Sequence, residues 1–375
     1  MSKVLFFMCN LNVGGAEKAL VDVINNLDHS KYSITLLLLS KEGMYLDKIN
    51  ENIQVKYIND SSNLIKFKIF NKINYLFIKY LPKLFYKLHI DEKYDVEIGF
   101  MEGIPMKFIS NSNNKHSKKI TWVHCDLMNH HWTKEMFNSG EEEQCYNKMD
   151  EIVFVSNGSK ESFNKLFNIN DVNQSIVYNP IIERDIIDKS NEKINTFDKF
   201  TIISVGRLDY QKGYDRLIKA HSKLVKKYPH NLVIIGEGQE RLTLEQMIKE
   251  LHVEDTVHLL GYKENPYAYI KNSDIYVCSS RSEGYSISVA EAVVLKKLII
   301  CTDIEGPKEI LQNGKYGIIC DNSESGIEEA LERVFEDESI KYKYFTKLQY
   351  DIPSFNHNKV ISEIESKLIN KKHTA

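Results

Sequence analysis

Short apolar runs alternate with helical patterns through the second half of the chain, and this alternation constrains the fold more than any other feature. Helical patterns occupy residues 213–227, 241–251 and 266–271, and a further helix begins at Ser288. Strands that alternate with helices form a parallel sheet covered on both faces, so we predict a doubly wound α/β domain. The expected strands are Phe200–Val205, Leu232–Ile235, Val257–Leu260, Ile275–Cys278, Leu298–Cys301 and Tyr316–Cys320.

The first half shows the same alternation less regularly. It opens with an apolar run at Val4–Met8, a turn with the sequence NLNVGG, and a helical pattern at Ala16–Leu27. A strand, a glycine turn and a helix form a unit that can bind phosphate, although two adjacent glycines also suit an ordinary tight turn. We therefore predict a second α/β domain, with further strands at 34–39, 55–58, 96–100, 120–123, 152–155 and 175–178.

The change of domain is predicted at Asn179-Pro180, because the run Glu183–Lys199 is polar, charged and poor in aromatic residues. The expected domains are residues 1–180 and 181–354. A helix is expected at about 355–375; it could pack back on the first domain, although nothing local decides which domain it ends.

Composition excludes several classes of protein. The net charge of −3 gives no reason to expect nucleic-acid binding. No window reaches the roughly 18 apolar residues that a membrane-spanning helix needs, and Met1–Met8 is too short for a signal peptide. The six cysteines form no C-x-x-C pair, so we expect reduced thiols, no metal site and a cytoplasmic location.

The segment 64–90 is unusually basic and aromatic. No acidic residue lies between Asp60 and Asp91, and Pro82 divides the segment into two expected amphipathic helices. Such helices could lie on anionic lipid at the inner face of the membrane, with aromatic rings at the interface; the alternative is a pair of core-packing helices with solvated lysines. The lysines are Lys66, Lys68, Lys72, Lys79, Lys83 and Lys87, interleaved with Phe67, Phe70, Tyr75, Phe77, Tyr80, Phe85 and Tyr86.

Two carboxylates bracket a loop that enters a helix in the stretch RSEGYSISVAEAVVLKK, which covers Arg281–Lys297. Glu283 follows a predicted strand, and Glu291 falls in the first turns of the helix that Ser286 or Ser288 would cap. The carboxyl end of a parallel strand is where such sheets bind ligands. The alternative is a capping box, because Ser288 and Glu291 also have the S-x-x-E spacing.

Two cations, Arg207 and Lys212, flank the turn after the first strand of the second domain. A guanidinium and an ammonium at this edge of a sheet suit a diphosphate better than they suit plain solvation. The next strand is followed by Gly236-Glu237-Gly238, but the third glycine of a dinucleotide fingerprint is missing. We therefore do not expect dinucleotide oxidoreduction.

These residues carry a resemblance to a known family. The segments ISVGRLDYQKGYDRLIKA, VIIGEGQERLTLE, VHLLGY and YVCSSRSEGYSISVAEA are similar, in order and spacing, to the donor-binding half of retaining GT-B glycosyltransferases of family 4. The amino-terminal GGAEKAL and the segment TWVHCDL resemble the family more loosely. The resemblance implies a GT-B fold, in which two Rossmann-like domains face each other across a cleft.

The resemblance also implies roles for individual residues. Arg207 and Lys212 match the basic pair that holds the donor diphosphate and stabilises it as a leaving group, without a metal or other cofactor. Glu291 matches the glutamate that binds the ribose, and Glu283 the one near the transferred sugar. His124 resembles a histidine that contacts the sugar; a hydrogen-bonded histidine at a strand end is the alternative. The other implied donor-site residues are Gly14, Gly15, Gly206, Gly236, Gly261, Tyr262, Gly284, Tyr285 and Ser286.

The sequence thus predicts a retaining glycosyltransferase that moves a sugar from a nucleotide donor, expected to be UDP-linked, to a lipid-linked glycan of surface polysaccharide synthesis. Glu283 is also a candidate nucleophile, although a binding role is favoured. The alternatives are a GT-B phosphorylase or nucleotide-sugar epimerase, and a non-catalytic nucleotide-sugar-binding subunit. Residues expected on the acceptor side are Glu102, Asp126, His130 and His131.

Overall fold

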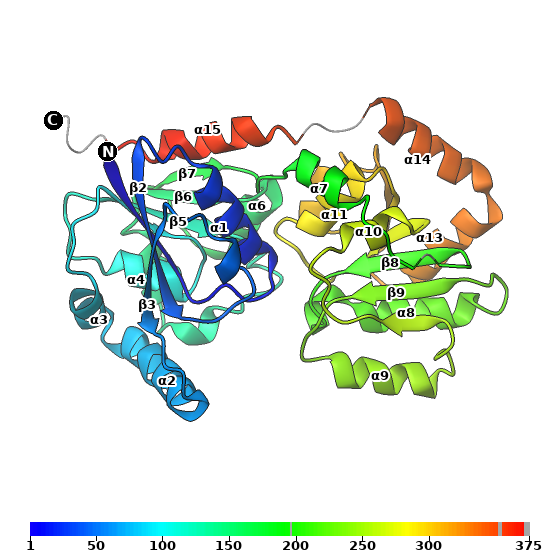
Figure 1. The fold of residues 1–375 in the computed structure, drawn as a ribbon, viewed down its shortest axis with the longest axis horizontal. Helices are drawn as coiled ribbons and strands as arrows, with labels where there is room; N and C mark the ends of the chain where they lie inside the picture. The colour runs from blue at the N-terminus through cyan, green and yellow to red at the C-terminus, as the bar shows by residue number, and fades with distance from the viewer. Residues whose placement is uncertain (196, 352–354, 371–375) are drawn as a thin grey trace. The chain divides into compact units, whose positions relative to one another are not determined.

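The computed structural model describes residues 1–195, 197–351 and 355–370, and the chain divides into two compact units (Figure 1). Unit 1 consists of Met1–Pro180 together with the segment that begins at Asn358. Unit 2 is Ile181–His357. Each unit is built on its own parallel sheet, so each is an α/β domain.

The sheet of unit 1 has seven parallel strands in the order β3-β2-β1-β4-β5-β6-β7. The strand order reverses between β1 and β4, and such a reversal leaves a crevice at the carboxyl ends of the two strands. The strands are β1 (Ser2–Met8), β2 (Tyr32–Ser40), β3 (Gln54–Asn59), β4 (Val96–Gly99), β5 (Lys118–Val123), β6 (Glu151–Phe154) and β7 (Asn173–Ile176).

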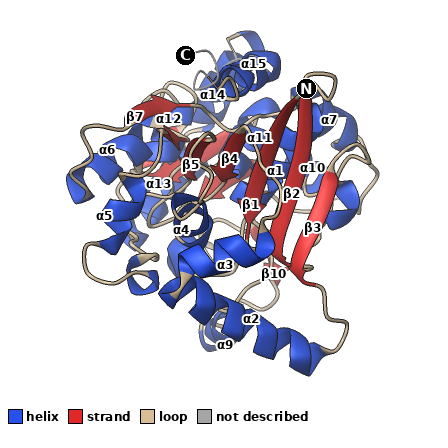
Figure 2. Cartoon of the chain, turned by 90° about the vertical axis from the view of Figure 1, so that its left-hand side faces the viewer, coloured by secondary structure: helices blue, strands red, loops and turns tan. Residues whose placement is uncertain are grey.

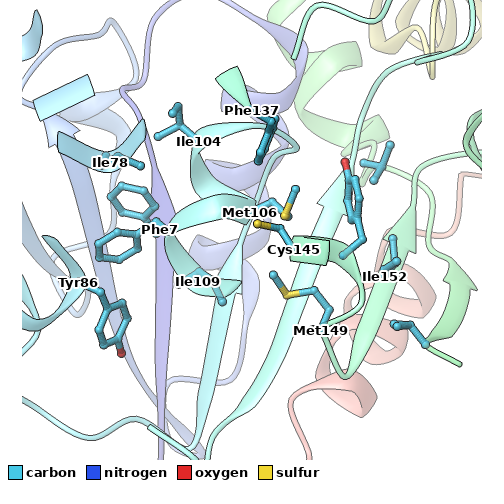
Figure 3. Close-up of a cluster of buried hydrophobic side chains, with 14 of the residues drawn as sticks. Phe7, Ile78, Tyr86, Ile104, Met106, Ile109, Phe137, Cys145, Met149 and Ile152 are labelled. Carbon is cyan, nitrogen blue, oxygen red and sulfur yellow. The ribbon is translucent and has the colours of Figure 1, made fainter. Parts of the chain in front are cut away.

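A hydrophobic cluster anchors several helices of unit 1, though not α1, to one face of this sheet (Figure 3). Phe7 of β1 packs against Phe108 of α4 with 4.1 Å between ring centroids, and both rings are fully buried. Ile78 of α2 and Tyr86 of α3 join the same cluster. The helices of the unit are α1 (Gly15–Asn26), α2 (Leu64–Tyr80), α3 (Pro82–His89), α4 (Ile104–Ser110), α5 (Glu141–Tyr146) and α6 (Asn157–Leu166), with 3-10 turns at η1 (Leu46–Lys48) and η2 (Lys134–Met136).

The helix pair α2 and α3 forms where expected, with Pro82 as the first residue of α3, and the pair lies on the outside of unit 1 (Figure 2). The expected placement of the aromatic rings is wrong for several of them. Phe85 and Tyr86 are fully buried, and Tyr75 and Phe77 pack against the core. The exposed apolar side chains are instead mostly aliphatic: Leu64, Ile65, Ile69, Ile73, Leu76, Leu81, Leu84 and Leu88, with Phe70 and Tyr80.

The carboxyl-terminal helix α15 (His357–Lys367) packs on unit 1. Lys118 Nζ donates a hydrogen bond to the Lys367 carbonyl at 2.9 Å, and Lys367 Nζ lies 2.8 Å from a carboxylate oxygen of Glu151. The backbone N–H of Asp28 donates to Glu365 at 3.0 Å. The last part of the helix expected here, residues 371–375, lies outside the described residues.

The sheet of unit 2 has six parallel strands in the order β10-β9-β8-β11-β12-β13, and its order reverses between β8 and β11. The last strand is shorter than the expected 316–320. The strands are β8 (Thr201–Val205), β9 (Asn231–Ile235), β10 (Val257–Leu259), β11 (Ile275–Cys278), β12 (Leu298–Thr302) and β13 (Ile318–Cys320).

The helices of unit 2 include several that the sequence pattern did not predict. These are α12, α13 and α14, which follow the helix predicted from Ser288, whereas the short helix α7 lies in the polar run after Pro180, where a little helix was expected. None of the described helices has the length and apolarity to span a bilayer. The helices are α7 (Glu183–Lys189), α8 (Tyr214–Leu224), α9 (Arg241–Glu250), α10 (Tyr267–Lys271), α11 (Ile287–Val294), α12 (Glu305–Ile310), α13 (Glu324–Glu336) and α14 (Glu338–Tyr350), with the 3-10 turn η3 (Tyr210–Lys212).

Candidate active site

The candidate site of unit 2 lies where its strand order reverses. β8 and β11 are neighbours, so the loops that follow them, residues 206–213 and 279–286, leave the same edge of the sheet side by side. The first loop carries Arg207 and Lys212, and the second carries Glu283 and Gly284. Lys212 and Glu283 are 71 positions apart in the chain. The topology of the sheet therefore brings together two groups of residues that are distant in sequence.

Arg281 holds these two loops together. Its guanidinium donates to both carboxylate oxygens of Asp215, at 2.9 and 2.8 Å, and to the Tyr210 carbonyl at 2.6 Å. The guanidinium also lies 3.8 Å from the centroid of the Tyr210 ring. Burial opposes ionisation of Asp215, but the Arg281 guanidinium outweighs that effect and lowers the pKa of this carboxyl. A bidentate pair of this kind fixes orientation as well as distance.

Backbone contacts strengthen the same connection. Ser279 Oγ donates to the Lys212 carbonyl at 2.8 Å, and Gln211 Nε2 donates to the Ser282 carbonyl at 2.8 Å. Gly213 has a φ of +65°, and a Cβ there would lie 2.2 Å from the Ser279 carbonyl oxygen. Only glycine fits this left-handed position so close to the neighbouring loop.

Lys212 and Glu283 form a direct ion pair across the two loops. Both side chains are largely buried, and Ser280 Oγ donates a second hydrogen bond to the same glutamate oxygen at 2.8 Å. Burial disfavours the charged ammonium, but the Glu283 carboxylate outweighs that cost, so the pKa of Lys212 is raised above its ordinary value. Lys212 is therefore a permanent cation at neutral pH.

A small hollow of about 10 Å³ opens beside this ion pair. Its walls come from the carboxyl ends of β8 and β11 and from the start of α11, and they are mostly polar. Hydroxyl groups dominate the wall, so the hollow offers many hydrogen-bonding groups and few apolar surfaces. It is lined by Ser204, Val205, Lys212, Tyr214, Tyr276, Cys278, Ser280, Glu283, Ser286 and Ser288.

The capping-box interpretation of Ser288 and Glu291 is wrong. The helix α11 begins at Ile287, so Ser288 lies inside it and cannot be its cap residue. Ser286 occupies the cap position, but its side chain makes no capping hydrogen bond within the described chain; its Oγ lies 3.3 Å from Ser288 Oγ. Glu291 instead lies about one turn into the helix, buried, and accepts a hydrogen bond from the Tyr267 hydroxyl at 2.9 Å.

The remaining expected donor-site residues lie on the loops at the same sheet edge. Arg207 is about half exposed, and its Nε lies 3.5 Å from a carboxylate oxygen of Asp209. Gly206 and Gly236 follow β8 and β9, and a Cβ on Gly236 would lie 1.9 Å from the Gly206 carbonyl oxygen. Gly261 and half-buried Tyr262 follow β10 in the next loop. Half-buried Tyr285 lies between Gly284 and Ser286, directly before α11.

The candidate residues of unit 1 lie at its own strand reversal, after β1, β4 and β5. Gly14 is the cap residue of α1 in an extended conformation, and Gly15 is the first residue of that helix. Glu102, fully buried after β4, accepts hydrogen bonds from the His124 backbone N–H at 2.9 Å and from Trp132 Nε1 at 3.0 Å. One carboxylate thus fixes both ends of the segment 124–132.

The Nε2 of His124 is buried and has no hydrogen-bond partner among the described residues. Burial lowers the pKa of this imidazole, while the charge of Glu102 and the Phe100 carbonyl act in the opposite direction. His124 is therefore neutral near pH 7. An unpartnered buried nitrogen at a strand end is unusual and suits a group that binds a ligand.

The other predicted acceptor-side residues have different surroundings. Asp126 accepts hydrogen bonds from Ser162 Oγ at 2.5 Å and Asn129 Nδ2 at 2.6 Å, so it organises its own loop. His130 is exposed, and His131 pairs with Glu142 at 2.8 Å. The described residues contain no cluster of three His, Cys, Asp or Glu side chains arranged to hold a metal ion.

Sequence reasoning did not identify the partners that hold these residues in place. Asp215 pairs with Arg281, which lies 66 positions away in sequence, and Tyr267 pairs with Glu291, which lies 24 positions away. Trp132 and its partner Glu102 are 30 positions apart. The only local signal was that Arg281 begins the motif that contains both glutamates. Long-range pairing of this kind leaves no periodic pattern in a single sequence.

A family model described as "Glycosyl transferases group 1" matches residues 186–350 of this chain. This range covers the strand reversal of unit 2 and both loops of its candidate site. The match therefore includes Arg207, Lys212, Glu283 and Glu291, the residues that the geometry brings to one edge of the sheet.

Relatives extend the likeness to both units. A Campylobacter jejuni protein named as a diphospho-undecaprenol 4-alpha-N-acetylgalactosaminyltransferase is 29% identical over 373 residues, covering 96% of this chain and 97% of that protein. The Anabaena HepE structure, solved with UDP and glucose, matches with a TM-score of 0.76 and 16% identity, covering 98% and 99% of the two chains. Sucrose-phosphate synthase from Thermosynechococcus elongatus matches equally well in TM-score, 0.76 at 11% identity, over 98% of each chain. The expected GT-B fold is confirmed.

We predict that Arg281→Gln lowers the free energy of unfolding of unit 2 by about 1–3 kcal/mol, because it removes charge-assisted hydrogen bonds and leaves Asp215 unpaired. Urea unfolding followed by circular dichroism measures the loss. The matched control is Arg241→Gln, which removes ion pairs to Glu237 and Glu245 on the surface of α9 and should cost less than about 1 kcal/mol. Equal losses in the two variants would contradict the role given to Arg281.

Proposed function

Because the chain is a group 1 glycosyltransferase with the GT-B fold, we propose that it transfers a sugar from a UDP-linked donor to a lipid-linked glycan, with retention of anomeric configuration and without a metal. The observation that carries the proposal is the ion pair of Lys212 with Glu283 beside the polar hollow. A cation and a carboxylate held side by side suit a donor that has a diphosphate next to sugar hydroxyls.

In this proposal, Lys212 and Arg207 stabilise the departing diphosphate. Departure of the nucleotide develops negative charge on phosphate oxygens, and cations already in place lower the barrier without reorganisation. An ammonium has three donors, so its bond to Glu283 leaves Lys212 able to contact phosphate as well. The amino terminus of α11, preceded by Gly284 and Tyr285, adds backbone N–H groups that favour an anion.

Glu291 and Tyr267 form the nucleoside side of the proposed donor site. A buried carboxylate accepts the two hydroxyl donors of a ribose well, and the Tyr267 hydroxyl holds one of its oxygens in position. UDP is the nucleotide we favour, since the fold neighbour from Anabaena was solved with UDP and glucose.

Glu283 acts as a sugar-binding group in this proposal rather than as a nucleophile. Lys212 and Ser280 both donate to its Oε1, which spreads the negative charge of the carboxylate over two donors. A carboxylate held in this way is a weak nucleophile and a good acceptor for a sugar hydroxyl. Retention would then follow from attack of the acceptor hydroxyl on the face that the diphosphate leaves.

The proposed contribution of unit 1 comes from His124 and from the turn at Gly14-Gly15. His124 offers its buried Nε2 to a sugar hydroxyl, and Glu102 keeps the backbone of His124 in place. The glycine turn lets the backbone approach a diphosphate closely. Asp126 contributes only indirectly, because its carboxylate is bonded to its own loop.

A lipid-linked acceptor is the preferred one for two reasons. The Campylobacter relative is named for transfer to a saccharide on diphospho-undecaprenol. In this chain, Ile65, Ile69, Leu76 and Tyr80 follow one stripe of α2 at helical spacing, and all four are exposed.

The charges around this stripe favour an anionic membrane. Lys68 and Lys72 are exposed and directly precede the exposed residues Ile69 and Ile73. One residue of an α-helix turns by about 100°, so the two lysines lie beside the apolar stripe. Lys79 behaves differently, because its Nζ donates to the Glu135 carbonyl at 2.7 Å and fastens α2 to the rest of unit 1. Apolar side chains that enter the bilayer surface, flanked by lysines that contact phosphate, form an interfacial helix.

We predict that Arg207→Gln reduces kcat/KM for transfer by about 10² to 10³, because a charge donor to the leaving diphosphate is lost. The half-exposed side chain makes few contacts, so the melting temperature should stay unchanged. The control is Arg184→Gln on α7, where a fully solvated arginine is removed from the same unit and transfer should persist. Wild-type turnover in Arg207→Gln would refute the proposed donor site.

We further predict that the chain floats with anionic phosphatidylglycerol vesicles and not with neutral phosphatidylcholine vesicles. Replacing Lys66, Lys68 and Lys72 by Gln should weaken binding by about 1 kcal/mol per lysine. The control variant replaces Lys165, Lys226 and Lys249, which are exposed lysines outside this segment. Binding that is absent in the wild type, or reduced equally by both triple variants, would exclude the α2 and α3 surface.

A further inference from the structure

The helix α14 lies on the outside of unit 2 (Figure 1), and three of its aromatic side chains are exposed. Tyr342, Phe345 and Tyr350 are 74%, 55% and 85% exposed. The opposite side of the helix attaches it to the unit, because Leu348 is fully buried and Tyr344 packs against the core. A cluster of large exposed rings on one anchored helix indicates a surface with a partner.

The charge around these rings is positive. The segment Ser339–Tyr350, with the sequence SIKYKYFTKLQY, contains three lysines and no acidic residue. Lys343 is exposed, and two more lysines lie near the carboxyl end, where Lys296 Nζ donates to Gln349 at 3.0 Å and Lys315 pairs with Asp351 at 2.7 Å. The acidic residues lie at the two ends of the helix: Asp337 and Glu338 at the amino-terminal end, and Asp351, which Lys315 neutralises, directly after Tyr350.

This combination fits a lipid surface better than a protein partner. Protein interfaces are enriched in tyrosine but depleted in lysine, whereas anionic membranes attract lysine and hold tyrosine rings at the head-group level. We propose that the exposed face of α14, formed by Tyr342, Lys343, Phe345 and Tyr350, is a membrane-binding surface for anionic lipid on unit 2. It is separate in sequence and in unit from α2 and α3, and it does not depend on the donor chemistry.

Hydroxyl-radical footprinting of the whole chain tests this surface without any substitution. Oxidation of Tyr342, Phe345 and Tyr350 should fall several-fold when phosphatidylglycerol vesicles are added, and should not change with phosphatidylcholine vesicles. Tyr210, which is 69% exposed on the same unit, serves as the internal reference. Phe70 and Tyr80 report on α2 in the same sample, so failure of this inference and failure of the α2 contact are distinguishable.

A triple variant gives a second measurement. Replacing Tyr342, Phe345 and Tyr350 by Ser should weaken binding to phosphatidylglycerol vesicles by about tenfold, equivalent to roughly 1.4 kcal/mol. These side chains are exposed, so the melting temperature should not change. The control is Leu242→Ser, which removes a 77% exposed apolar side chain from α9 and should leave vesicle binding unchanged.

Two outcomes would overturn the inference. One is unchanged oxidation of the α14 rings while those of α2 become protected, which would restrict membrane contact to unit 1. The other is protection of the α14 rings without vesicles that rises with protein concentration, which would show that a second copy of this chain covers the face.

Discussion

The contact between the loops after β8 and β11 is the constraint on which the candidate active site depends. Parallel pairing of these strands places the loops side by side, and the bidentate pair of Arg281 with Asp215 fixes their spacing. Lys212 can then meet Glu283 directly, although burial makes each charge costly alone. The ion pair is therefore a product of the fold and also the main polar feature of the site.

Unit 1 uses a similar arrangement around a buried lysine. Lys107 on α4 is fully buried, and its Nζ contacts Glu141 at 2.7 Å and the carbonyl of Lys79, at the end of α2, at 2.9 Å. The same nitrogen lies 3.3 Å from the Met136 carbonyl, close to the segment that Glu102 holds. Lys107 thus connects the end of α2 to Met136, which follows the segment 124–132 in the chain.

The sequence predicted both sheets because their strands are apolar, short and regularly spaced, and the motif residues fall where parallel strands end. It could not predict Asp215 as the partner of Arg281, since that contact depends on tertiary structure. Of the two cap candidates, Ser286 occupies the cap position, whereas Ser288 fails because α11 begins at Ile287 and therefore includes it. Phe85 and Tyr86 are buried, as the core-packing alternative for this segment predicts. The sequence did not distinguish the two alternatives, because an amphipathic helix can direct its apolar face to the core or to a membrane.

Transfer of label from a radioactive UDP-sugar tests the central claim most directly. The purified chain would be incubated with a panel of UDP-sugars and with polyprenyl-diphosphate-linked glycans in anionic vesicles, and the lipid fraction analysed. We expect one donor to label the lipid-linked glycan, with the donor's anomeric configuration retained in the product. Release of UDP or isomerisation of the donor, without label in any glycan, would contradict the account.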